Sequence, residues 1–110
     1  IRLSLVGSEM CIRDRLAADR GIAVIVNRPF RQGDLLRQLK RHRLPGWAAD
    51  LGCDSWAQAA LKFIISHPAV TVAIPATTQV AHVRQNLGAM RGPLPDARLR
   101  SRMAADVAAL

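Results

Sequence analysis

Residues 66–87 read SHPAVTVAIPATTQVAHVRQNL, and this stretch decides the fold that the sequence predicts. Residues 70–74 are a short apolar run that ends at Pro75, which has no N–H to give to a sheet ladder. Such a run is typical of a parallel strand covered on both faces. Thr77 or Thr78 can then cap a helix. The inner face of that helix is predicted to be Val80, Val83, Leu87 and Met90.

A second strand, with its own flanking helices, precedes this unit. Residues 22–26 form another unbroken apolar run, and Gly21 ends the helical pattern of residues 16–20 before it. Asp34 then caps a helical stretch that Pro45-Gly46 breaks. The apolar stripe of that stretch is Leu35, Leu36 and Leu39.

The segment between the two strands contains the clearest helical pattern. Ser55 and Gln58 match a capping box, which fixes the start of this helix, and Pro68 ends it. A narrow polar stripe consists of Gln58, Lys62 and Ser66. The predicted core face has the spacing of a helix and consists of Trp56, Ala59, Ala60, Phe63 and Ile64.

The alternation of helices with buried strands favours a parallel α/β sheet. A last helix, which Asp96 can cap, follows a Pro-rich link at residues 91–95. Its apolar stripe is Leu99, Met103, Val107 and Leu110. Two parallel strands make a small sheet with two open edges, which is a poor independent domain. We therefore expect an α/β chain that is part of a larger fold.

The composition is globular, with an excess of basic residues. Half of the 110 residues are hydrophobic, and the formal net charge is +8. One region gathers six basic residues: Arg28, Arg31, Arg37, Lys40, Arg41 and Arg43. Such a charge favours a phosphate-bearing ligand, a nucleic acid or an anionic surface, and it is also common on the solvated surface of a larger protein.

The cysteines and histidines give no sign of a disulfide framework or a metal site. Cys11 and Cys53 are the two cysteines, so a reducing compartment and a cytoplasmic location are expected. We expect Cys53 to be a small buried apolar residue. The three histidines have no metal-ligand spacing with it, and no stretch reaches the ~18 apolar residues of a membrane span.

Residues 1–15, IRLSLVGSEMCIRDR, show neither a helical nor a strand period. The segment SLVGSEMCIRD within them resembles the translated adapter sequence that contaminates some assembled sequencing reads. We therefore expect a non-native leader at residues 1–15 and a native segment at residues 16–110, with an ordinary loop-strand leader as the alternative.

Four segments, in this order, resemble the C-terminal part of the aldo/keto reductase family. Residues 21–30 resemble a strand and the loop after it, and residues 60–68 resemble the next helix. Ile74-Pro75-Ala76-Thr77 and Gln85-Asn86-Leu87 resemble the last βα unit, and residues 92–96 resemble the tail. The resemblance covers residues 16–110 and implies the last two strands, with their helices, of an incomplete (β/α)₈ TIM barrel.

The end of the second strand has the pattern of an anion site. A strand end followed by a helix presents free backbone amides at the positive end of a helix dipole. His82, Gln85 and Asn86 fall at i, i+3 and i+4 and share one face of that helix. The resemblance implies that this face contacts the adenine of NADP, and that Thr77, with Thr78 beside it, contacts the 2′-phosphate region. It also implies that the pyrophosphate lies along Arg28, Phe30 and Gly33.

The chain departs from the family pattern at three positions. Many members have Lys where Ala76 stands and Arg where His82 stands, and both losses weaken a preference for NADP over NAD. Many members also stack a Tyr on the nicotinamide where Asn27 stands. NADP therefore stays the expected cofactor, with NAD as the alternative.

The resemblance implies a parent enzyme that transfers hydride from NADPH to a small carbonyl substrate. In the family a Tyr is the general acid, supported by Asp, Lys and His. This chain contains no Tyr. We therefore assign no catalytic residue and no metal ligand, and we expect the chain alone to be inactive.

Two other functions stay open at this stage. A small basic module could bind nucleic acid through the arginine-rich helix near residues 34–43, and its affinity would then depend steeply on salt. That hypothesis leaves the pattern of residues 74–87 unexplained. The other alternative is an inert structural fragment.

Overall fold

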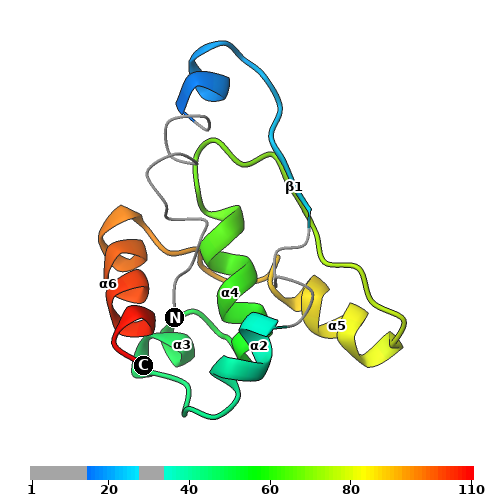
Figure 1. Ribbon diagram of the computed structural model, residues 1–110, viewed down its shortest axis with the longest axis vertical. Helices are drawn as coiled ribbons and strands as arrows, with labels where there is room; N and C mark the ends of the chain where they lie inside the picture. The colour runs from blue at the N-terminus through cyan, green and yellow to red at the C-terminus, as the bar shows by residue number, and fades with distance from the viewer. Residues whose placement is uncertain (1–14, 28–33) are drawn as a thin grey trace.

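The computed structural model describes residues 15–27 and 34–110. Residues 15–19 form a short helical segment, and Gly21 follows it with φ of 68°, which confirms a helix tail closed by glycine. The elements that follow are β1 (Ile25–Asn27), α2 (Asp34–Leu39), α3 (Gly46–Asp50), α4 (Trp56–Ile65), β2 (Val72–Ile74), α5 (Val80–Gly88) and α6 (Ala97–Ala108) (Figure 1).

The two strands form a parallel sheet, as the sequence predicts. Val26 of β1 lies opposite Ala73 of β2, and Asn27 lies opposite Ile74. Both strands are shorter than the apolar runs that predicted them. At the start of the pairing the Val24 N–H donates to Thr71 Oγ1 at 3.0 Å, so a side chain there takes the place of a ladder acceptor.

The sheet is covered on one face, whereas the sequence predicted cover on both. Val26 is buried, and Ala73 packs against the same core. Their neighbours point the other way, because side chains alternate along a strand. Ile25 is 62% exposed and Ile74 is 49% exposed. In residues 15–27 and 34–110, no helix buries this second face.

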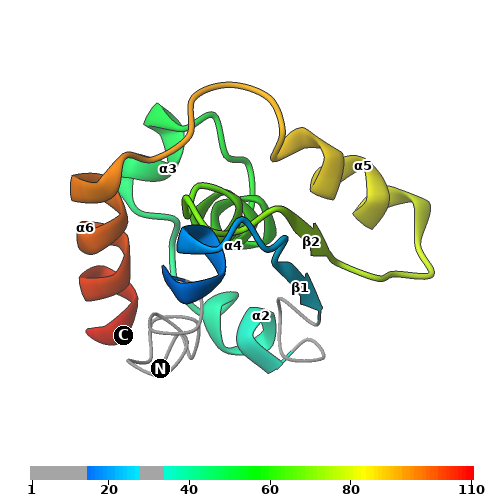
Figure 2. The ribbon, with the colours of Figure 1, turned by 90° about the horizontal axis from the view of Figure 1, so that it is seen from above.

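The core surrounds α4, which lies between the sheet, α2, α3 and α6 (Figure 2). Trp56, Phe63 and Ile64 are buried, which confirms the predicted core face of α4. Trp47 of α3 meets Trp56 edge to face, with ring centroids 6.2 Å apart. Both indole N–H groups have acceptors, because Trp47 Nε1 donates to Asp106 Oδ2 at 2.8 Å and Trp56 Nε1 donates to the His42 carbonyl at 2.9 Å.

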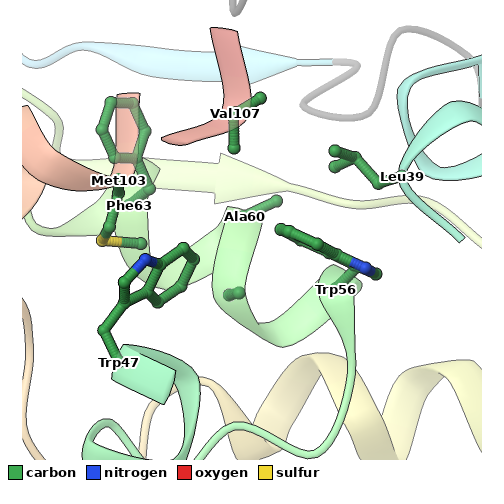
Figure 3. A pocket seen from close by; sticks show the side chains of 8 residues that line it. Leu39, Trp47, Trp56, Ala60, Phe63, Met103 and Val107 are labelled. Carbon is green, nitrogen blue, oxygen red and sulfur yellow. The ribbon is translucent and has the colours of Figure 1, made fainter. Parts of the chain in front are cut away.

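A small apolar cavity of about 20 Å³ lies beside this tryptophan pair (Figure 3). Its volume is close to that of a single water molecule, which makes it a packing defect rather than a binding site. It is lined by side chains of α2, α3, α4 and α6: Leu39, Trp47, Trp56, Ala59, Ala60, Phe63, Met103 and Val107.

The segment before α4 differs from the prediction of one helical stretch up to residue 45. The first helix, α2, ends at Leu39, and a second short helix, α3, begins at Gly46. Pro45 is the N-cap of α3, with φ of −64° and ψ of 163°. Proline disfavours the helical region only for the residue directly before it, so Pro45 explains the start of α3 but not the end of α2 at Leu39.

The predicted caps of α4 and α6 are confirmed. Ser55 Oγ accepts from the Gln58 N–H at 3.3 Å, and Asp96 Oδ1 accepts from the Leu99 N–H at 2.8 Å. In α6, Met103 and Val107 are buried as predicted. Leu110 is 42% exposed instead, because α6 ends at Ala108 and the helical spacing no longer holds beyond it.

The polar stripe of α4, Gln58, Lys62 and Ser66, faces other parts of the chain rather than water. Lys62 is fully buried, and its Nζ donates to three carbonyls: Leu51 at 2.5 Å, Arg91 at 2.6 Å and Pro93 at 3.0 Å. Ser66 Oγ accepts from Arg100 Nη1 of α6 at 2.8 Å. The stripe therefore holds the segments that follow α5 against α4.

Candidate functional site

The carboxyl ends of the two strands meet at one edge of the sheet. Because β1 and β2 are parallel, their last residues, Asn27 and Ile74, are register partners. Ligands in parallel α/β folds bind beyond this edge. The segment that leaves β2 here, residues 75–79, leads directly to α5.

Thr77 and His82 are in contact at this edge. Thr77 Oγ1 lies 3.2 Å from His82 Nδ1 and also accepts from the Gln79 N–H at 3.2 Å. The N-cap of α5 is Gln79, whose side chain makes no capping hydrogen bond, so the prediction of Thr77 or Thr78 as the cap was wrong. The helix begins at Val80, since Gln79 is still extended at φ −108° and ψ 128°. Thr77 thus supports the turn before the helix.

The other predicted adenine contacts lie along the same helix. Asn86 is half-buried, and its Nδ2 donates to the Pro75 carbonyl at 3.4 Å, which ties α5 to the strand end. Gln85 and Thr78 are exposed. The structure therefore gathers Thr77, His82 and Asn86 at the strand end, with Gln85 one turn along.

The apolar face predicted for α5 is not buried. Val80 is 69% exposed, Leu87 is 58% exposed, and Val83 and Met90 are also exposed. The helix instead turns its glycine side toward α4, where a Cβ built on Gly88 would lie 2.6 Å from Gln58 Nε2. In the part of the chain that the structure describes, nothing buries this apolar face.

The structure describes only some of the other positions that the sequence analysis singled out. Arg28, Phe30 and Gly33, the predicted pyrophosphate contacts, lie outside the described residues. Asn27 and Ala76, which stand where many family members have Tyr and Lys, are both exposed. Among residues 15–27 and 34–110, no cluster of His, Cys, Asp or Glu side chains could hold a metal ion.

Sequence reasoning placed Gln58 on a polar stripe but did not foresee its contact with α5. Its side chain is buried; its Oε1 accepts from the Asp54 N–H at 2.7 Å, and its Nε2 donates to the Gln85 carbonyl at 3.1 Å. The available signal was an amide at the third position of a helix that is otherwise strongly apolar. Such a residue is buried only when its hydrogen bonds are satisfied.

Cys53 is buried, as predicted. Burial raises the pKa of its thiol above the ordinary value of 9.0, while the nearby Lys62 acts in the opposite direction and Asp54 adds to the rise. A thiol in this environment is a poor nucleophile. Among the described residues no helix has the length and apolar character needed to cross a membrane.

The basic region near residues 34–43 is not one helix. Arg37 lies on α2, where its guanidinium pairs with Asp34, and the helix ends at Leu39. Lys40 and Arg41 lie in the turn that follows. The arginine-rich helix that the nucleic-acid hypothesis requires is therefore shorter than predicted.

Comparison with known proteins gives one family. The model of the aldo/keto reductase family matches residues 6–105 of the chain. That range includes both strands, the whole of α5 and the strand edge described above, and it begins within the proposed leader. No curated protein and no solved structure matched the chain.

Proposed function

Because the chain belongs to the aldo/keto reductase family, we propose that it supplies the dinucleotide-binding end of a nicotinamide-dependent carbonyl reductase. The observation that carries this proposal is the contact of Thr77 with His82 beside the carboxyl end of a parallel strand. In this proposal the groups that drive the reduction belong to other βα units of the barrel.

The side chains at this edge fit a phosphate-bearing nucleotide. A hydroxyl and an imidazole lie next to each other at the start of α5, where the helix dipole favours an anion. Gln85 offers an exposed amide one turn further along, and an amide can both donate to and accept from an adenine edge. The bound dinucleotide would supply the hydride, while this chain would bind and orient it.

The open face of the sheet supports the view that the chain forms the last two βα units of a barrel. Ile25, Val72 and Ile74 are large apolar residues that are exposed there. In a (β/α)₈ barrel, inward-facing residues of this type fill the interior. We further propose that the parent enzyme is cytoplasmic and that residues 1–15 are a non-native leader. Sequencing the natural transcript upstream of codon 16 tests the last point.

For the cofactor, we propose NADP, with NAD as the alternative. His82 is the side chain beside Thr77 that can carry a positive charge for a 2′-phosphate, and Ala76 adds none. Calorimetric titration of the 110-residue chain with NADP⁺ and NAD⁺ tests binding. His82→Ala should weaken NADP⁺ by about tenfold, the effect of losing one charge-assisted hydrogen bond, and should leave NAD⁺ less affected. If His82→Ala bound NADP⁺ and NAD⁺ with the same affinities as the parent chain, the proposal would be contradicted.

The same proposal expects no turnover from this chain alone. The family's general acid is a Tyr, and the sequence has none. Purified protein mixed with NADPH and a panel of aldehydes should show no carbonyl-dependent loss of absorbance at the nicotinamide band. Carbonyl-dependent oxidation of NADPH above the protein-free rate would contradict the proposal that the catalytic groups belong to other βα units.

A further inference from the structure

The position of α5 does not come from apolar packing of the helix. Within the described residues, α5 buries none of its own side chains, and its apolar side chains Val80 and Leu87 point into solvent. The helix lies at the margin of the molecule, on the side opposite α6 (Figure 2). The contacts that hold α5 are therefore the polar ones made with Gln58 and by Asn86, together with the buried C-cap residue Ala89.

Gln58 supplies such a contact from the first turn of α4. Its amide is buried and bonded at both ends: Oε1 accepts from the Asp54 N–H, and Nε2 donates to the Gln85 carbonyl. The first bond fixes the orientation of the amide, because an amide has one acceptor end and one donor end. The donor end is then aimed at α5.

The C-terminal turn of α5 provides a backbone acceptor for this donor and the space that the Gln58 amide occupies. The Ala89 N–H donates to the Asn86 carbonyl at 3.2 Å, a tightened last turn, and the neighbouring Gln85 carbonyl accepts from Gln58. Gly88 lies against the amide, and a Cβ at that position would come within 2.6 Å of Nε2. The close approach of the two helices thus depends on one glutamine and one glycine.

We propose that Gln58 is a positioning residue for the dinucleotide site. Its amide sets how closely α5 approaches α4, and through the helix it sets where His82 and Asn86 stand relative to Thr77 and Pro75. Lys62, one turn later on α4, fixes the chain beyond α5 through the Arg91 and Pro93 carbonyls. This inference rests on the function proposed above.

The test measures the affinity of the 110-residue chain for NADP⁺ at a temperature at which every variant is folded. Gln58→Met keeps the size of the side chain and removes both hydrogen bonds. Gly88→Ala places a Cβ where the Gln58 amide lies and so displaces that amide from the Gln85 carbonyl, without changing the predicted ligand face. Each should weaken NADP⁺ by about tenfold, the equivalent of one misplaced hydrogen bond. Two matched controls, Ser66→Ala on the same stripe and Gly46→Ala at an open position, should leave the affinity unchanged.

A double variant separates positioning from a general loss of stability. Truncation in Gln58→Ala leaves room for a Cβ at Gly88, so adding Gly88→Ala to it should cost less than twofold in affinity. The same glycine change should cost about tenfold in the parent chain. Additive losses, or Gln58→Met with the affinity of the parent chain, would refute the role of Gln58 while the proposed function stands. A parent chain that binds no dinucleotide would overturn the proposed function and this assignment with it.

Discussion

Replacing Lys62 with Met should destabilise the folded chain strongly, although the two side chains are similar in size. Lys62 is fully buried, and its Nζ bridges the end of α3 to the link after α5. A hydrogen bond to a charged donor contributes about 1.5–3 kcal/mol, net of the exchange with water. In Lys62→Met the three carbonyls lose this donor, and a carbonyl that stays buried without a partner costs about 1–3 kcal/mol. Two of the three bonds are only partly buried, so we expect about 3 kcal/mol.

Urea unfolding followed by tryptophan fluorescence measures this loss, since Trp47 and Trp56 both lie in the core. With a slope of about 2 kcal/mol/M, the midpoint should fall by about 1.5 M. Lys40→Met is the matched control, because Lys40 is exposed and the substitution is the same. It should change the free energy of unfolding by less than ~0.5 kcal/mol. A Lys62→Met midpoint within the error of the Lys40→Met midpoint would show that the three carbonyls do not depend on this side chain.

Three further predictions concern the core, a cap and the buried thiol. Val107→Ile adds one methylene beside the small cavity and should raise the free energy of unfolding by about 0.8 kcal/mol, measured as a higher urea midpoint; a lower midpoint would mean that the cavity cannot accept the methylene. Asp96→Ala removes the acceptor for the Leu99 N–H and should cost about 1 kcal/mol, whereas Asp50→Ala, at the end of α3, should cost less. Burial raises the pKa of the Cys53 thiol, so the folded state favours the neutral thiol. The stability that this preference contributes is fully present below the ordinary pKa of 9.0 and is lost as the pH rises through the folded pKa. In a Cys11→Ser chain the unfolding free energy should therefore fall above pH 9, and Cys53→Ala should flatten this fall relative to the same background.

Local signals in the sequence predicted those parts of the fold that local physics controls. The caps at Ser55 and Asp96, the stop at Gly21 and the parallel pairing of two apolar runs are all present. The break between α2 and α3 was harder to predict, because α2 ends at Leu39 although no Pro or Gly occurs before Pro45. The strand lengths also depend on partners. In the described ranges, 15–27 and 34–110, each strand has one neighbour, and β1 and β2 pair over three residues instead of the five that were predicted.

The candidate site shows where periodicity alone fails. An apolar stripe indicates which face of a helix avoids water, but it does not say which part of the protein covers that face. In α5 the stripe that includes Val80 and Leu87 is exposed, and the contact with α4 runs through Gly88 and the Gln85 carbonyl. In the polar stripe of α4, by contrast, Gln58 and Lys62 are buried and Ser66 is half-buried, because each finds a partner in a distant segment. The partners of Gln58 and Lys62 in those segments are backbone carbonyls, which no side-chain pattern can reveal.

These two reversals have one physical explanation under the proposed barrel. A terminal βα unit has to hold its last helix against the preceding one and at the same time present apolar side chains to the rest of the barrel. Directional hydrogen bonds from Gln58 can hold α5 in place while its apolar face stays free for that second contact. Apolar packing alone would not keep that face free. Such packing is non-directional, so it would rotate the apolar stripe of α5 toward α4. The exposed strand residues Ile25 and Ile74 fit the same requirement, since they too present apolar surface away from the core that this chain builds.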